Sequence, residues 1–265
     1  MTPRSAARIS IVAAYMLFLV AWPLWMVIDE TFFSGENYLA IALSDPTLRS
    51  AIGVTLAASA CAVVLNTVFG VGLGILLVRY RFPGRRLLSA LTDLPASVSP
   101  IVVGLALLLA YGPVHGALGA PLAEMGVRMV FSFPGIVLAV TFVSLPLVLR
   151  AVVPVLKEVG IDQETAAQSL GASGRQVLLR ITLPSIKWAV AYGVVLTLAR
   201  AVGEFGAVLI VSGGIVSQTE TATIAVQRLH QGFETGQAYA LGFLLALVAV
   251  AALGIVTILR PHERH

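Results

Sequence analysis

The sequence predicts an all-α polytopic membrane protein with six transmembrane helices. Hydrophobic residues make up 58% of its 265 residues and charged residues only 11%, whereas a soluble domain normally has about 25% charged residues. The mean hydropathy is +0.95. Because a spanning helix needs about 20 apolar residues, long runs with few charges mark the candidate spans. These runs are residues 9–28, 50–78, 94–110, 130–149, 188–212 and 235–259.

The first apolar run is interpreted as a membrane span and not as a signal peptide. It is longer than a typical apolar signal core, and Asp29 and Glu30 follow it without a small-residue cleavage site. The acidic segment that continues to Arg49 is expected to be a connector outside the cytoplasm with a partial surface helix.

The positions of Lys and Arg predict the orientation, because cytoplasmic segments of membrane proteins are enriched in both. With the N-terminus in the cytoplasm, 13 of the 17 Lys and Arg residues fall on the cytoplasmic side. The outer segments then hold only Arg49, Arg128 and Arg228, and Arg200 lies within the membrane. We therefore expect both termini, and the polar segment 158–185, in the cytoplasm.

Two of the predicted spans contain interruptions. Residues 93–100 hold two prolines together with Ser97 and Ser99. This composition breaks the helix and suits the lining of a polar cavity. Pro146 should kink the fourth span or free a carbonyl group from its helical partner.

The second span carries features that favour close contact with other helices. Gly70 and Gly74 are four residues apart, the spacing at which small residues let two helix backbones approach. Asn66 in the same span can hydrogen-bond across to a neighbouring helix. Both features are interpreted as structural.

The polar stretch from Glu164 to Pro184 is flanked by long apolar runs on both sides. Its first part has helix formers up to Gly171, where a glycine with positive φ can end the helix. Ser173 can cap a second short helix that ends before Pro184. Two short helices joined at a glycine predict a rigid knob at the membrane surface, with a solvated connector as the plainer alternative.

The chain lacks the motifs that would make it an enzyme on its own. A P-loop needs a lysine after a glycine, and neither Lys157 nor Lys187 follows one. Metalloprotease and nucleophile-elbow motifs are absent too, the lone Cys61 has no partner, and the four histidines lack metal-ligand spacing. We expect no catalytic residues, no metal, no cofactor and no nucleic-acid partner. ATP hydrolysis would require a separate chain.

The polar stretch resembles the EAA loop of ABC importer permeases, the segment that docks into the ATPase subunit. The pattern is Glu-Ala-Ala, three residues, Gly, nine residues and Ile-x-Leu-Pro. Its glutamate position is taken here by Thr165, with Glu164 one place earlier. The resemblance implies the type I ABC importer permease fold and an ATPase-coupling role for these residues. The positions that match are Ala166, Ala167, Gly171, Ile181, Leu183 and Pro184.

Further stretches are similar to the sulfate/thiosulfate branch of these permeases. They are residues 81–84, 93–95, 97–100, 133–139, 199–208 and 211–213, and residues 66–70 favour the W-type subunit over the T-type. The resemblance implies a bacterial cytoplasmic (inner) membrane protein surrounded by lipid. It also implies a T-type permease as heterodimer partner, two ATP-binding cassette ATPase subunits and a periplasmic sulfate-binding protein.

Three other functions stay open on the sequence. Molybdate and tungstate permeases share much of the pattern, often as homodimers. A secondary transporter or channel without an ATPase would also have six spans and an intramembrane ion pair. A structural membrane subunit without a transport path is a third alternative.

Arg200 and Glu204 lie four residues apart in the fifth run, so they share one helical face and can pair. An unpaired charge near the middle of a span costs at least about 2.5 kcal/mol, so pairing or water access is expected. One interpretation is a structural ion pair between two permeases. The other places Arg200, with Ser97 and Ser99, on the translocation path, where its fork of donors offsets the charge of a passing oxyanion.

Overall fold

The computed structural model describes residues 11–113 and 116–259. In that part of the chain the backbone forms helices joined by turns and short loops. Four helices are long and apolar enough to cross a membrane, residues 11–32, 46–79, 133–159 and 235–252. Two further pairs of helices also qualify when each bent pair counts as one span, which raises the number to six. The fold is thus an all-α polytopic membrane fold.

The helices follow one another closely along the chain. They are η1 (Leu17–Ala21), α2 (Trp22–Phe32), α3 (Tyr38–Ser44), α4 (Pro46–Arg79), α5 (Arg85–Ser97), α6 (Pro100–Tyr111), α7 (Gly119–Glu124), α8 (Phe133–Ser144), α9 (Pro146–Val159), α10 (Asp162–Ser169), α11 (Gly174–Val177), η2 (Leu178–Thr182), α12 (Leu183–Ser185), α13 (Lys187–Val202), α14 (Gly206–Ser212), α15 (Ala222–Gln231) and α16 (Thr235–Leu259).

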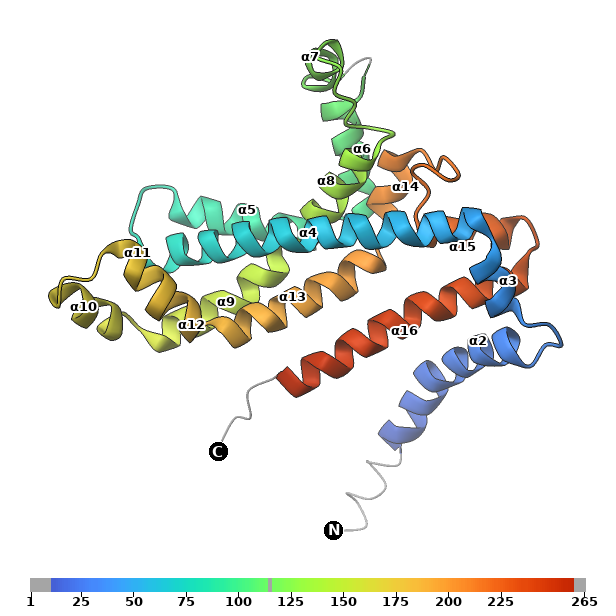
Figure 1. Ribbon diagram of the computed structural model, residues 1–265, viewed down its shortest axis with the longest axis horizontal. Coiled ribbons are helices and arrows are strands. Elements are labelled where there is room, and N and C mark those ends of the chain that lie inside the picture. The colour runs from blue at the N-terminus through green and yellow to red at the C-terminus, as the bar shows by residue number, and fades with distance from the viewer. Residues whose placement is uncertain (1–10, 114–115, 260–265) are drawn as a thin grey trace.

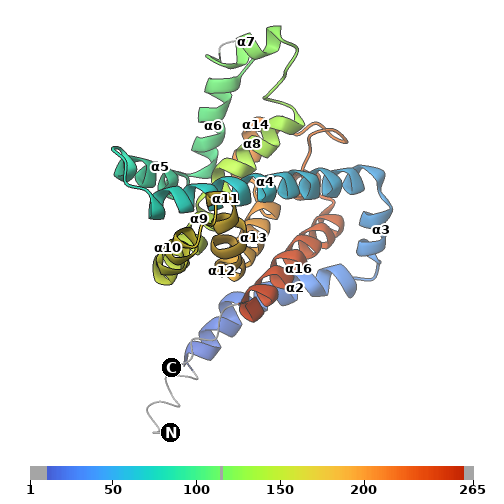
Figure 2. The same ribbon diagram turned by 60° about the vertical axis from the view of Figure 1, so that its left-hand side comes forward.

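Helix α4 runs along most of the length of the molecule, and α9, α13 and α16 lie beside one another below it (Figure 1). The short helices α10 to α12 project at one end of α4, and α3 and α15 lie at the other end. Helix α6 leaves this bundle at a steep angle and carries α7 at its tip, as Figures 1 and 2 both show. Helix α2 lies against α16.

Helix α4 begins at a well-formed cap. The Asp45 side chain accepts hydrogen bonds from the Thr47 backbone N–H at 2.7 Å and from the Thr47 hydroxyl at 2.8 Å, and Pro46 occupies the first helical position. The hydrogen bond from the Thr47 side chain is the main reason that the pKa of Asp45 lies below its usual value, against the opposing effect of burial.

Small residues let α4, α9 and α13 approach closely around Val148. A Cβ atom at Gly70 of α4 would lie 2.9 Å from Val148 Cβ, and one at Gly193 of α13 would lie 2.9 Å from Val148 Cα. Asn66 of α4 donates to the Thr141 carbonyl at 3.1 Å and to the Ser144 hydroxyl at 2.8 Å. The interhelical contacts predicted for Gly70 and Asn66 are confirmed.

The interruption predicted around Ser97 and Ser99 is confirmed, but only Pro100 stands at it, since Pro95 lies inside the preceding helix. Helix α5 ends at Ser97, α6 begins at Pro100, and the two are bent by 114°. Helix α8 ends at Ser144 and α9 begins at Pro146, but Leu145 between them keeps helical dihedral angles, so residues 133–159 still form one span. In both places the proline lacks the N–H group that would continue the preceding helix and sits instead in the first turn of the next one.

The fifth apolar run, expected as a single span over residues 188–212, is not a continuous helix. Helix α13 ends at Val202, residues 203–205 are not helical, and α14 starts at Gly206. This second break packs against the first one. A Cβ atom at Gly206 would lie 3.1 Å from Pro100 Cβ and 3.2 Å from the Ile101 N atom. The composition suggested one continuous helix, but the chain breaks at residues 203–205 and α14 packs closely on α6 instead.

Candidate functional site

The knob predicted at the polar stretch exists, and its two local signals are confirmed. Helix α10 ends just before Gly171, whose φ is +88°, a conformation that favours glycine. Ser173 caps α11 with a complete capping box, in which Ser173 and Gln176 each bond to the other's backbone N–H. A glycine turn followed by a capping box gives the chain a fixed path between the two helices.

The second helix of the knob is longer than predicted. The expectation that it ends before Pro184 is wrong, because α11 continues through the π-helical turn η2 into α12 and stops at Ser185. In the wider π turn the Leu183 N–H bonds to the Leu178 carbonyl. The next residue is Pro184, which needs no acceptor, so the π turn accommodates the proline. The helix then bends by 67° into α13.

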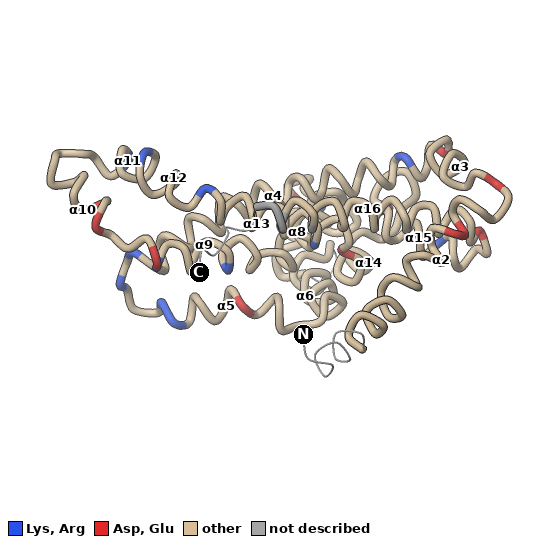
Figure 3. The backbone as a smooth tube through the Cα atoms, turned by 90° about the horizontal axis from the view of Figure 1, so that it is seen from below, with Lys and Arg blue, Asp and Glu red and all other residues tan. Residues whose placement is uncertain are grey.

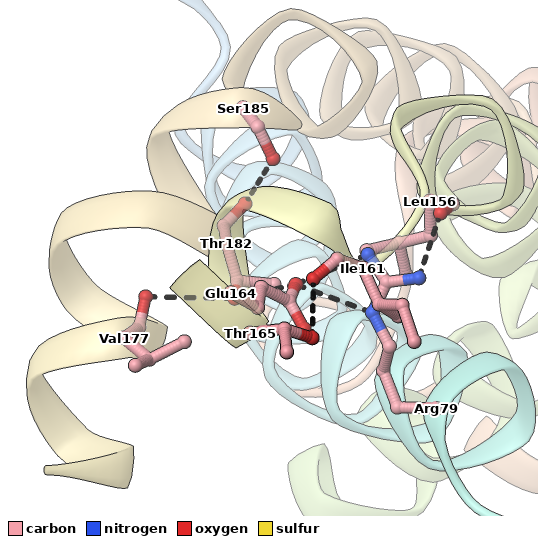
Figure 4. Close-up of polar contacts among 8 residues, drawn as sticks. All are labelled: Arg79, Leu156, Ile161, Glu164, Thr165, Val177, Thr182 and Ser185. Atoms are coloured by element: carbon pink, nitrogen blue, oxygen red, sulfur yellow. Dashed lines mark hydrogen bonds and ion pairs between the residues drawn. The ribbon is translucent and has the colours of Figure 1, made fainter. Parts of the chain in front are cut away.

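A largely buried ion pair joins the knob to the end of α4. Arg79 donates from Nε at 3.2 Å and from Nη2 at 3.0 Å to Glu164 Oε1, which also accepts from the Thr182 hydroxyl at 2.9 Å (Figure 4). Arg79 Nη1 donates to the Leu156 carbonyl at 2.9 Å. We call Arg79, Glu164, Thr182 and the Leu156 carbonyl the Arg79–Glu164 clasp. It connects α4, α9, α10 and η2.

The clasp is well shielded from solvent, since only 10% of the Arg79 side chain and 16% of the Glu164 side chain are exposed. Glu164 therefore points into the protein. Thr165, which occupies the glutamate position of the EAA pattern, is exposed, and its hydroxyl donates to the Ile161 carbonyl at 2.9 Å. The acidic residue that comes one place early thus holds the knob together from inside.

The other predicted coupling residues divide between the surface and the interior of the knob. Ala166, Gly171 and Pro184 are exposed, whereas Ala167, Ile181 and Leu183 are partly buried. Leu183 packs against a small core in which Val148, Val152, Leu156 and Ile186 are buried. The knob therefore rests on the helix bundle through its second helix.

Sequence reasoning missed the most exposed apolar side chain of the knob. Leu170 lies at the tip, directly before Gly171, and is 90% exposed. Leu179 on η2 and Ile161 before α10 are also exposed. The sequence did contain a signal for this exposed side chain, a leucine directly before the turn glycine of a polar loop. Exposed apolar side chains on a projecting knob favour contact with another protein.

The predicted pairing of Arg200 and Glu204 is confirmed, with 2.6 Å between Arg200 Nη1 and Glu204 Oε2. The Arg200 side chain is 38% exposed and that of Glu204 only 2%. Glu204 lies in the break between α13 and α14, where its Oε1 accepts from the Ala207 N–H at 3.0 Å. The buried Glu204 carboxylate thus accepts a hydrogen bond from the first turn of α14 and forms an ion pair with the partly exposed Arg200 guanidinium.

Ser97 and Ser99 lie on the surface of the break between α5 and α6. Ser99 directly precedes Pro100, which contacts the second break at Gly206. The structure therefore brings the two sets of predicted path residues to the meeting point of two broken helices. The knob lies elsewhere, at the far end of α4 (Figure 1).

A second buried glutamate went unnoticed in the sequence. Glu220 accepts from Arg228 Nε at 2.7 Å through Oε1 and from Nη2 at 3.3 Å through Oε2, at the α15 end of the molecule. The hydrogen bond to Glu220 is the main reason that the pKa of Arg228 is raised. The two residues are eight apart, a spacing that gives no pattern signal.

Basic side chains gather at one end of the bundle. Figure 3 shows Lys and Arg concentrated where α10–α12, the start of α5 and the end of α9 lie, whereas acidic residues mark the α3 end. The basic segments 79–86, 150–157 and 175–187 are far apart in sequence and meet at this end. An uneven distribution of this kind is typical of proteins that cross a membrane.

The chain belongs to the family of binding-protein-dependent transport system inner membrane components, whose model matches residues 67–265. It is therefore the membrane-embedded permease component of an ABC transporter, which is not itself catalytic. A chain in the crystal structure of a bacterial ABC transporter involved in the import of the acidic polysaccharide alginate has the same fold. The TM-score is 0.77 at 18% identity, covering 96% of this chain and 92% of the other.

Among relatives of known name, the chain is 41% identical to the sulfate transport system permease protein CysW of Synechocystis sp. over 257 residues, 97% of this chain and 93% of the relative. It is 42% identical to CysW of Escherichia coli K12, over 92% of this chain and 83% of the relative. The permease CysT of Salmonella typhimurium is 37% identical over 80% of this chain and 76% of the relative.

Removal of the clasp carboxylate should loosen the knob. Glu164→Gln leaves Arg79 shielded without its charged partner, and hydrogen bonds to charged groups contribute about 1.5–3 kcal/mol each. We expect amide hydrogen exchange in residues 162–182 to rise at least tenfold, measured by mass spectrometry in detergent. Glu158→Gln is the matched control, because Glu158 is exposed and lacks an ion-pair partner among the described residues. Equal exchange in the two variants would contradict a stabilising role for the clasp.

Proposed function

We propose that the chain is a transmembrane permease subunit of an ATP-driven ABC importer for sulfate and thiosulfate. The single observation that carries this proposal is the rigid, exposed knob at the basic end of a permease-family chain. The names of relatives with 41–42% identity over at least 92% of this chain support the substrate class.

The energy for transport would come from separate ATPase subunits, since the chain has no P-loop. We propose that two such subunits bind the complex and that the knob, residues 158–185, docks into one of them. Leu170 at the tip and the exposed Thr165 and Ala166 suit the contact surface. Glu164 acts in coupling through the clasp, which fixes the knob to α4.

The proposed topology has six spans, approximately residues 9–28, 50–78, 94–110, 130–149, 188–212 and 235–259, the fifth of them broken at residues 203–205, within one permease domain. Both termini and the knob are cytoplasmic, in a bacterial inner membrane. Residues 1–10 and 260–265, which hold the termini, lie outside the described residues. The basic end seen in Figure 3 supports this orientation.

Two permeases would form the translocation path, this chain and a T-type partner, and a periplasmic binding protein would deliver the oxyanion. We propose alternating access as the mechanism. ATP binding draws the ATPases together, the knobs move as rigid levers, and the cavity between the permeases opens to the other side. The paired breaks at Ser97–Pro100 and Val202–Gly206 are suitable points for this rocking, because a broken helix bends with little loss of hydrogen bonds.

A molybdate or tungstate permease is the second candidate, since tetrahedral oxyanions share one geometry. A secondary transporter without an ATPase is disfavoured because such a protein needs no projecting knob. The same argument disfavours a structural subunit without a transport path.

Uptake into proteoliposomes tests the function. With the partner permease, the ATPases and the binding protein present, labelled sulfate should enter only with ATP, and faster than labelled molybdate. Gly171→Val should reduce uptake at least tenfold, because a β-branched residue resists positive φ. Gly174→Val is the control, since Gly174, the first residue of α11, has an ordinary φ and free space around it. Equal uptake without ATP would contradict the proposal, and preference for molybdate would assign the second candidate.

The role of Arg200 is tested by the double variant Arg200→Gln with Glu204→Gln, which removes both charges and leaves neither unpaired. If Arg200 lies on the path, the complex assembles and hydrolyses ATP, but sulfate uptake falls at least tenfold. If the pair only holds helices together, assembly weakens and each assembled complex transports normally.

A control of nearly identical chemistry is available in Arg228→Gln with Glu220→Gln. In that ion pair the Arg228 side chain is 39% exposed and the Glu220 side chain is 1% exposed, but the pair lies at the α15 end of the molecule. Wild-type uptake kinetics in an assembled Arg200→Gln, Glu204→Gln complex would remove Arg200 from the path.

A further inference from the structure

A polar cleft of about 260 Å³ lies between α5 and α9, with the end of α4 as its floor. The α5 wall carries four polar side chains and the α9 wall two. They are Arg85, Ser89, Thr92, Asp93, Arg150 and Lys157. The rest of the lining is apolar, from α4 and α9.

The cleft carries an excess of positive charge. Arg150 donates to Asp93 Oδ1 from Nη2 at 2.7 Å and from Nε at 3.1 Å, so one cation is already neutralised. Arg85 and Lys157 have no ion-pair partner within the described part of the chain. Three cations and one carboxylate leave two net positive charges, the charge that a dianion offsets.

The two faces of α5 explain why its polar side chains line the cleft. Leu87, Leu91 and Leu94 lie three to four residues apart, so they form an exposed apolar stripe along one side of α5. Arg85, Ser89, Thr92 and Asp93 occupy the opposite side and face α9. The polar side of α5 thus forms one wall of a cleft that stays open to solvent, since the Asp93 and Arg150 side chains are each 54% exposed.

We propose that this cleft binds a tetrahedral oxyanion of the sulfate or phosphate type. Arg85 and Lys157 supply the charge, and the Arg150–Asp93 pair fixes one edge of the site. The Ser89 hydroxyl is a further donor, whereas the Thr92 hydroxyl is already engaged with the Ser89 carbonyl at 2.7 Å. Arginine donors suit such an anion because their fork matches two of its oxygens.

The anion has two possible sources, free sulfate in the aqueous phase or the phosphate group of an anionic lipid. Both offer the same oxygen tetrahedron, and basic pockets between transmembrane helices bind acidic headgroups. In the proposed orientation the cleft lies on the cytoplasmic side, where free sulfate would be the transported product. The site would then report product concentration to α9, the helix that leads into the knob.

Binding to the purified chain tests the proposal and requires neither ATPase nor transport. The first arm measures labelled sulfate binding by equilibrium dialysis in zwitterionic nanodiscs at constant ionic strength. The second arm measures phosphatidylglycerol retained by the protein from mixed nanodiscs, by native mass spectrometry. We expect saturable binding in one arm, weakened at least tenfold by Arg85→Gln with Lys157→Gln.

The matched control is Arg81→Gln with Arg86→Gln, which removes the same charge from the same end of α5 but outside the cleft. If only the cleft variant loses sulfate binding, the ligand of the cleft is free sulfate. If only the cleft variant loses phosphatidylglycerol retention, the ligand is a lipid headgroup. The double variant Arg85→Lys with Lys157→Arg keeps both positive charges and should retain binding. This result would show that changing these two side chains does not by itself misfold the site. Equal loss in the cleft and control variants, or no saturable binding in either arm, would overturn the proposal. Failure of ATP-driven sulfate uptake alone would overturn only the transport function.

Discussion

The Arg79–Glu164 contact is the interaction on which the rest of this structure depends. It unites the last residue of the longest helix with the first turn of the knob, across 85 positions of sequence. Because the pair is shielded and Thr182 shares the same carboxylate oxygen, the two helices of the knob cannot move separately without exposing or unpairing a charge. Movement of the knob is thereby tied to movement of α4.

The bundle beside the knob is closely packed around Val148. Gly70 and Gly193 approach it from α4 and α13, so three helices meet with little room between their backbones. Closely packed interiors transmit displacement instead of absorbing it. The two breaks, at residues 98–99 and 203–205, lie beyond this packed region and touch each other through Pro100 and Gly206. The molecule therefore combines a closely packed bundle with a pair of adjoining helix breaks.

The sequence allowed some of this to be predicted, and the successes share a cause. Gly171, Ser173, Pro100 and Pro146 act through local backbone chemistry, which a few neighbouring residues determine. The apolar runs likewise identified helices α4 and α16 because their signal is confined to one segment.

Most of the features that escaped prediction depend on contacts between distant segments. Nothing near Glu164 indicates that Arg79 is its partner. The break at residues 203–205 contains no proline and arises where α14 packs on α6. The continuation of the knob helix through Pro184 depends on a π turn, which propensity does not signal. The cleft between α5 and α9 likewise appears only once the bent α5 lies beside the bundle.

The central claim is that the knob and α4 move as one rigid body, and an interspin distance tests it most directly. In a Cys61→Ala background, spin labels at Val64 on α4 and Ser169 on α10 both occupy exposed positions. Double electron–electron resonance on the assembled complex should give one narrow distance distribution that is the same without nucleotide and with ATP trapped. A distribution that shifts by more than its own width when ATP binds would show that the knob moves independently of α4, and would contradict the account.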